Sequence, residues 1–192
     1  MQFQELLSEV GQALSAEEKA TDLAFETSRR IIRKTKTAIH GIHVGERDPE
    51  LIDSISSDIA GLVESLKNYP GLIFGNDVQS AMSEFAETVI YDQVLQGLEI
   101  SSYCDLEITP AAWILGLADS IGELRRDMLT ALIDDDLGRA ASIFESMENL
   151  TDALMDFDIK DNVVPIRRKQ DIARSILDRS RSDLATAKIM KK

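Results

Sequence analysis

Apolar residues recur at helical spacing along the whole chain, and this regularity constrains the fold more than any other feature. In segment after segment they lie three or four positions apart, as they do on one face of an α-helix. No stretch has the convincing apolar–polar alternation that is typical of a half-buried strand. Aromatic residues make up only 5% of the chain, whereas helix-favouring alanine, leucine, glutamate and arginine are common. The pattern predicts an all-α fold.

The length of the chain predicts one domain, residues 1–192, with a substantial hydrophobic core. The predicted helices number about seven, which is many long elements for this length. We therefore expect an elongated bundle whose spare apolar surface goes into oligomer contacts. The predicted helices cover about 3–14, 15–43, 49–68, 76–97, 110–133 and 137–157, and a last one opens at Pro165.

Four local signals set these helix starts. Ser15-Ala16-Glu17-Glu18 has the capping-box pattern, which predicts that a new helix begins there. Asp48-Pro49 and Thr109-Pro110 each combine a capping side chain with a proline suited to the first helical position. Asn76 or Asp77 can cap the fourth long helix.

Cysteine usage and hydropathy predict the compartment. The single Cys104 rules out a disulfide within the chain, and no charged-then-apolar leader opens the sequence. The longest apolar stretches are far shorter than a membrane span requires. A cytoplasmic protein without membrane contact is the expectation.

Charge is distributed unevenly along the chain, although the net charge of −13 by itself argues against a polyanionic ligand. Residues 46–159 carry 24 acidic and 5 basic side chains, whereas residues 160–192 carry 10 basic and 4 acidic ones. Local basic strips can still bind a polyanion, because salt screens distant charges. Two roles stay open for one such strip, nucleic-acid binding or ion pairing with the acidic middle of another subunit. The strip consists of Arg29, Arg30, Arg33, Lys34 and Lys36.

Two pairs of acids at helical spacing are the candidate chemical site. Glu84 and Glu87 are three residues apart, and Asp119 and Glu123 are four apart, so each pair shares one helix face. Acid pairs of this kind are common on solvated helix surfaces, and for the first pair alone that is the commoner explanation.

The second pair has unusual neighbours. Its helix face also holds Ala112, Leu115 and Gly116, where a solvated face would carry lysine, glutamine or arginine. The carboxylates of Asp119 and Glu123 are therefore expected to point into a partly dry space, where an unpaired charge is costly. A divalent cation would resolve that conflict, and oxygen ligands suit Mg²⁺ or Mn²⁺. Such an ion can activate water and stabilise charge on a phosphodiester.

Other chemistries find little support in the residues. Cys104 has no evident histidine partner, and the sequence contains no glycine-rich phosphate loop and no Glu-x-x-His motif for a di-iron site. His40 and His43 are expected to be surface or interface residues. The basic residues of the last helix, which alternate with acids, are expected mainly to form ion pairs along that helix.

The same segments resemble the translin/Trax family over nearly the whole chain. Ser28–His40 is similar to the long first helix of that family. Glu84–Glu87, Thr109-Pro110 and above all Leu115–Arg126, with its Leu-Gly-x-Ala-Asp-x-x-Gly-Glu-Leu block, resemble Trax in particular. The resemblance implies a seven-helix translin fold that assembles into hollow oligomers holding RNA or single-stranded DNA.

For Trax-like members the resemblance implies a Mg²⁺-dependent endoribonuclease acting on single-stranded RNA, with its catalytic and metal-binding carboxylates at Glu84, Glu87, Asp119 and Glu123. Phe74–Asp77 departs from the Arg- and His-rich RNA-binding segment of translin, so the contacts to nucleic acid are not carried over there. The chain is shorter than eukaryotic members. It is therefore expected to be a minimal, archaeal-type form that makes a homo-oligomer, a hexamer or octamer, or one that pairs with a translin-like subunit.

Two other functions remain open at the level of sequence. One is an oligomeric RNA- or DNA-binding protein without nuclease activity. The other is a MazG-like nucleotide pyrophosphohydrolase, which also uses carboxylates and Mg²⁺ on helices. Its usual second motif is Glu-x-x-Asp, whereas this chain has Asp119-x-x-x-Glu123.

Overall fold

The computed structural model describes residues 2–190, and within that range the chain forms seven α-helices and no β-strand. This confirms the all-α prediction. The helices are α1 (Gln2–His43), α2 (Pro49–Ser65), α3 (Pro70–Ile73), α4 (Asn76–Gln96), α5 (Pro110–Ile133), α6 (Leu137–Met155) and α7 (Ile166–Met190).

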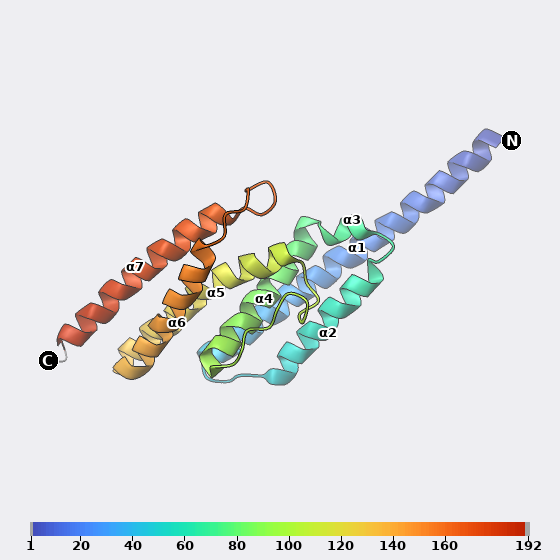
Figure 1. The fold of residues 1–192 in the computed structure, drawn as a ribbon. Helices are drawn as coiled ribbons and strands as arrows, with labels where there is room; N and C mark the ends of the chain where they lie inside the picture. Colours follow the sequence, from blue (N-terminus) through green and yellow to red (C-terminus); the bar gives the residue numbers. More distant parts are fainter. Residues whose placement is uncertain (1, 191–192) are drawn as a thin grey trace.

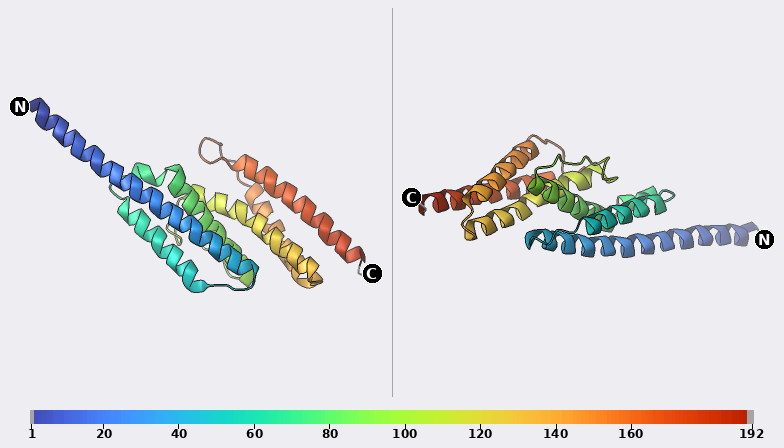
Figure 2. Two further views of the ribbon diagram at one scale, coloured as in Figure 1. Left: turned by 180° about the vertical axis from the view of Figure 1, so that it is seen from behind. Right: turned by 90° about the horizontal axis from the view of Figure 1, so that it is seen from below.

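The helices form an elongated molecule in which α4 and α5 pack against each other at the centre (Figure 1). α1 and α2 cover α4 on one side, while α6 and α7 pack on α5 on the other. The N-terminal part of α1 projects beyond the remaining helices, as both views of Figure 2 show. No helix in the described range is both long and apolar enough to cross a membrane.

α1 is one continuous helix of 42 residues, so the predicted break between residues 14 and 15 is wrong. Gly11, one turn before Ser15, does not interrupt the helix, and no proline is present. The residues directly beside Ser15 are good helix formers, Leu14, Ala16 and Glu17. Apolar residues at helical spacing form a stripe before residue 15. It lies on the projecting part of α1, and its side chains are 53–72% exposed: Phe3, Leu6, Leu7, Val10 and Leu14.

Two predicted helix starts are confirmed at the level of hydrogen bonds. The side chain of Asp48 accepts from the backbone N–H of Leu51 at 3.0 Å, directly before Pro49. Thr109 does the same for Ala112 at 3.2 Å. These caps satisfy backbone donors that have no partner within the helix.

Smaller features also differ from the prediction, among them the end of α2, which lies at Ser65 and not near residue 68. The short helix α3, Pro70–Ile73, occupies a segment expected only to end the preceding helix. α4 is preceded by Gly75 in an extended conformation, so neither Asn76 nor Asp77 is the cap residue. α6 ends at Met155, two residues before the predicted end, which lies within the normal fraying of helix termini.

One face of α5 carries a stripe of apolar residues at helical spacing, and this stripe is buried in the core. Its side chains are at most 5% exposed: Ile114, Leu117, Ile121, Leu124 and Met128. Burial of this stripe turns the opposite face, which carries Asp119 and Glu123, toward α4 and the space beside it.

Gly116 is the point of closest approach between α4 and α5. A Cβ atom at this position would lie 2.5 Å from the carbonyl oxygen of Ser83, 2.6 Å from Cβ of Ala86 and 2.7 Å from the amide nitrogen of Glu87. No side chain can occupy such a space, because the neighbours are mainly backbone atoms of a packed helix. The absence of a side chain therefore lets α5 lie directly on the turn of α4 that bears the first acid pair.

Replacing Gly116 with alanine is expected to destabilise the fold by about 1–3 kcal/mol, because the added methyl group forces the two helices apart. For a chain of this size the melting temperature would fall by roughly 2–4 °C for each kcal/mol. Thermal unfolding followed by circular dichroism measures the change.

Gly122→Ala is the matched control on the same helix, since a Cβ there would meet nothing within 4 Å. Alanine is the better helix former by about 0.8–1 kcal/mol, so this variant should be as stable as the wild type or more so. Equal effects of the two substitutions would contradict the close-packing role of Gly116.

Candidate functional site

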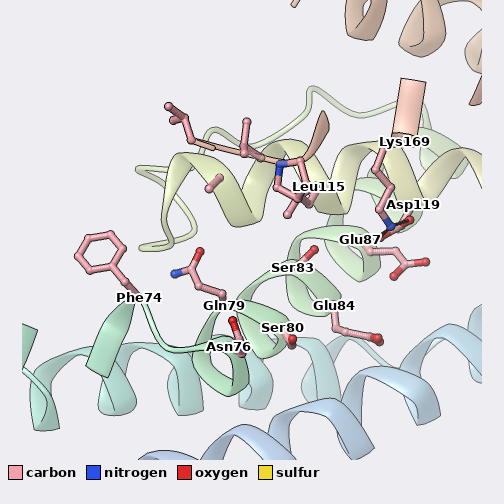
Figure 3. A pocket seen from close by; sticks show the side chains of 14 residues that line it. Phe74, Asn76, Gln79, Ser80, Ser83, Glu84, Glu87, Leu115, Asp119 and Lys169 are labelled. Carbon is pink, nitrogen blue, oxygen red and sulfur yellow. Dashed lines mark hydrogen bonds and ion pairs between the residues drawn. The ribbon is translucent and has the colours of Figure 1, made fainter. Parts of the chain in front are cut away.

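The four predicted carboxylates come together where α4 and α5 cross. Glu84 and Glu87 project from α4, and Asp119 and Glu123 from α5, and the charges of the α5 acids act on both α4 acids. Figure 3 shows Glu87 beside Asp119, with Glu84 on the same helix as Glu87. Helical spacing puts each pair on one face, and the contact at Gly116 brings the two faces together.

Burial and mutual repulsion disfavour the charged forms of Glu84 and Glu87 in the cluster. Burial raises the pKa of Glu87 to about 8, and the other three carboxylates add to this rise. Burial also raises the pKa of Glu84, while the ammonium group of Lys36 opposes the rise. With no further cation bound, Glu87 is therefore largely protonated at neutral pH.

Lys169, in the first turn of α7, is a direct partner of the cluster. Its Nζ lies 2.5 Å and 2.7 Å from the two carboxylate oxygens of Asp119. Its charge also lowers the pKa of Glu87, although less than burial raises it. The expectation that the basic residues of the last helix serve mainly ion pairs along that helix is therefore wrong for Lys169. It holds for pairs such as Arg174 with Asp171.

Glu123 also has a protein partner, the side chain of His43 at the end of α1. Nε2 of His43 lies 2.5 Å from the carboxylate of Glu123, and Nδ1 lies 2.9 Å from the hydroxyl of Tyr91. That hydroxyl donates a hydrogen bond to the buried Asp127, and burial together with this bond raises the pKa of Tyr91. The His43 side chain is only 5% exposed, so of the two predicted positions, surface or interface, the surface one is wrong for this residue. His40 is exposed, as expected.

Two cavities border the cluster, and Glu84 and Glu87 line both of them. The larger cavity, of about 590 Å³, is also lined by Asp119, Lys169 and residues 163–165. Figure 3 shows Lys169 and Asp119 toward one end of it and Phe74 toward the other. Its far end is neutral and partly apolar, and it includes Phe74, Gln79, Ser80, Ser83 and Leu115. The smaller cavity, of about 320 Å³, is lined by Lys36, Ile39, His40, Glu84, Glu87, Glu123 and Arg126. The carboxylates are thus accessible from two sides.

The basic strip of α1 divides into two groups. Arg30 and Lys34 face α2, where they bind the carboxylate of Asp58 at 3.3 Å and 2.8 Å. This pairing is within one subunit, whereas the sequence suggested pairing between subunits. Lys36 lines the smaller cavity beside the cluster, while Arg29 and Arg33 are exposed, with Arg29 over the ring of Phe25.

The four side chains suit a hard divalent cation, because all of them offer carboxylate oxygens. A cation would also relieve the repulsion between their negative charges. In the described range, however, no three histidine, cysteine, aspartate or glutamate side chains are arranged to share one metal ion. Two of the four acids are turned toward protein partners, Asp119 toward Lys169 and Glu123 toward His43. A shared ion would require these two carboxylates to exchange partners.

Several solved protein structures are similar to this chain in sequence and fold. AfC3PO, solved in complex with duplex RNA, is 30% identical to this chain and superposes on it with a TM-score of 0.81. The match covers 96% of this chain and 97% of the AfC3PO chain. A second AfC3PO structure is 31% identical over the same shares, with a TM-score of 0.80. The chain belongs to the translin/Trax family. Apo-NeC3PO, at 18% identity with 94% of this chain and 96% of its own covered, shares the fold with a TM-score of 0.83.

One protein sequence is also similar to the chain. An uncharacterised protein of Methanocaldococcus jannaschii, MJ0175, is 32% identical over 176 residues, which are 90% of this chain and 78% of that protein. No family model matches the chain.

Sequence reasoning missed the two partners of this translin/Trax site, His43 and Lys169. Both lie far from the acids in the chain, since 80 residues separate His43 from Glu123 and 50 separate Lys169 from Asp119. A histidine ending an otherwise amphipathic helix carries no local signal of such a partner. Lys169 is equally unmarked, because it sits among basic residues that alternate with acids.

Replacing Glu87 with glutamine should stabilise the metal-free protein at high pH. The pKa of Glu87 is about 8 in the fold and near 4.5 in the unfolded chain, so the wild type loses stability as pH rises between these values. Glutamine does not ionise and escapes this loss. Melting temperatures in EDTA should be close at pH 4.5 and should favour Glu87→Gln by about 3 °C or more at pH 8.5.

The exposed Glu99 provides the comparison, because Glu99→Gln should change the melting temperature by a similar small amount at every pH. A difference between Glu87→Gln and the wild type that does not grow with pH would contradict the raised pKa.

Proposed function

We propose that this translin/Trax protein is a divalent-metal-dependent endoribonuclease whose site consists of Glu84, Glu87, Asp119 and Glu123. The observation that carries the proposal is that four carboxylates lie close enough together to raise the pKa of Glu87, beside two cavities. The similarity to AfC3PO, which was solved with duplex RNA, supports RNA as the ligand.

The four carboxylates would hold Mg²⁺ or Mn²⁺, which when bound supplies Lewis acidity and stabilises negative charge on the reacting phosphodiester. The other roles belong to the chain itself. Glu87 borders both cavities and is placed to accept a proton from an attacking water molecule. His43 orients Glu123 through the contact of its Nε2 atom, and a hydrogen bond between its Nδ1 atom and the Tyr91 hydroxyl fixes the imidazole ring.

Basic side chains at the edges of the cavities would attract the RNA backbone. Lys36 and Arg126 line the smaller cavity, and the exposed Arg29 and Arg33 extend the positive surface along α1. Arg30 and Lys34 would act less directly, because both are engaged by Asp58. Of the five basic residues predicted to bind nucleic acid, Lys36 therefore has the strongest structural support.

Assembly into a homo-oligomer is part of the proposal. The projecting part of α1 presents its apolar stripe to solvent, with Phe3 72% and Leu14 61% exposed, which is typical of a surface that is covered in an assembly. A hexamer, an octamer or an assembly with a translin-like subunit would each cover it. Single-stranded RNA is the proposed substrate, and single-stranded DNA a further ligand.

The test is cleavage of end-labelled RNA of one sequence, offered single-stranded and as a duplex, with Mg²⁺ or with EDTA. Glu123→Gln is expected to lower the rate by at least about 10–100-fold, because it removes one of the four carboxylates that would hold the metal ion. Glu99→Gln, which removes an exposed acid outside the site, is the matched control and should retain full activity.

Cleavage that persists in EDTA, or an unimpaired Glu123→Gln variant, would contradict the proposal. RNA binding that weakens steeply with salt but produces no cleavage would instead identify a binding-only protein. The engagement of Asp119 and Glu123 by Lys169 and His43 is the observation that favours this second function. Nucleoside triphosphates, tested beside RNA, examine the pyrophosphohydrolase alternative.

A further inference from the structure

Lys169 stands where the acidic cluster meets the larger cavity. Its ammonium group contacts both carboxylate oxygens of Asp119, at 2.5 Å and 2.7 Å, and it lines the cavity together with Glu84 and Glu87. Figure 3 shows it descending from α7 onto Asp119. A cation on the cluster and the ammonium group of Lys169 would therefore compete for the same oxygens.

The backbone that carries Lys169 is held firmly. Ile166, three residues earlier, is 1% exposed, and the side chain of Gln170 donates to the carbonyl oxygens of Leu154 and Phe157 at 2.9 Å and 2.8 Å. Farther along α7, Arg125 of α5 binds Ser180 at 2.7 Å. The helix cannot easily move away from the site, so a change at Lys169 would be a movement of its side chain.

The chemistry of lysine suits such a movement. Its ammonium group is a compact charge on a flexible four-carbon stem, whereas arginine would hold Asp119 in a rigid bidentate pair. The side chain is 31% exposed, and the pair with Asp119 is accessible to solvent, so breaking it is inexpensive. The cavity beyond it is lined mainly by neutral residues, such as Ser83 and Leu115. A phosphate group entering that cavity would meet Lys169 as the nearest positive charge.

We propose that Lys169 is a built-in counter-ion that neutralises Asp119 until a divalent cation binds, and that its released ammonium group then binds a phosphate of the RNA backbone in the larger cavity. This inference rests on the proposed nuclease function and deepens it. The side chain exchanges one anionic partner for another, and no covalent bond forms or breaks. Metal occupancy and RNA binding would thereby be coupled at one residue.

The proposal predicts opposite effects of one substitution on two measurements. Lys169→Met removes the competitor for Asp119, so Mn²⁺ should bind about fivefold more tightly to the RNA-free protein, as expected for loss of a partly exposed ion pair. The same variant should lose about tenfold or more in kcat/KM for RNA at saturating Mg²⁺, because the phosphate loses its charged partner. A purely structural role would not strengthen Mn²⁺ binding while weakening catalysis.

The measurements are Mn²⁺ titration followed by electron paramagnetic resonance and cleavage kinetics on single-stranded RNA. Arg168→Met is the matched control, since it removes one positive charge from the neighbouring exposed position on α7. It should change both quantities less than twofold. Lys169→Arg keeps the charge and can pair with Asp119 in a bidentate way, so it should bind Mn²⁺ no more tightly than the wild type. Lys169→Gln serves as a second neutral variant if thermal unfolding shows that Lys169→Met does not fold.

Mn²⁺ affinity that is unchanged or weakened in the folded neutral variants, with a wild type that binds Mn²⁺ and cleaves RNA, would overturn the counter-ion role and leave the nuclease intact. A wild type that neither binds Mn²⁺ nor cleaves RNA would overturn the nuclease, and the counter-ion role with it. Tighter Mn²⁺ binding with unchanged kcat/KM would overturn the phosphate contact.

Discussion

The backbone contact between α4 and α5 at Gly116 is the constraint on which the rest of this structure depends. A side chain at that position would overlap with backbone atoms of Ser83 and Glu87, so the two helices can meet there only through a glycine. The contact joins the half of the molecule built on α1, α2 and α4 to the half built on α5, α6 and α7. It also sets the distance between the two acid pairs, because both lie within about two turns of it.

The close approach of these helices brings negative charges together, and their repulsion is destabilising. Side chains from the first and last helices partly offset this repulsion. Burial and mutual repulsion raise the pKa of Glu87 to about 8. α7 supplies Lys169 to Asp119, and α1 supplies His43 to Glu123. Neither partner neutralises Glu87, so the cluster keeps a deficit of positive charge that a divalent cation can fill. Such a balance is typical of a site in which stability is given up for binding.

Much of the fold could be predicted, because helices depend on residues close together in sequence. The caps at Asp48 and Thr109 and the buried stripe of α5 are local patterns, and the structure has them as expected. The predicted break at Ser15 was wrong because a capping pattern does not end a helix whose flanking residues all favour it. The acid pairs were visible for the same local reason, since three- and four-residue spacings define a helix face.

Sequence by itself determined that the chain is all-α, which helix faces carry the acids and the family to which the chain belongs. Tertiary structure alone decided which charges meet those acids. Lys169 and His43 reach the cluster across 50 and 80 residues of chain, and Arg30 and Lys34 are turned away from it toward Asp58. The physical reason is that helical periodicity acts over a few residues, whereas the pairing of charges between helices depends on how the whole bundle packs.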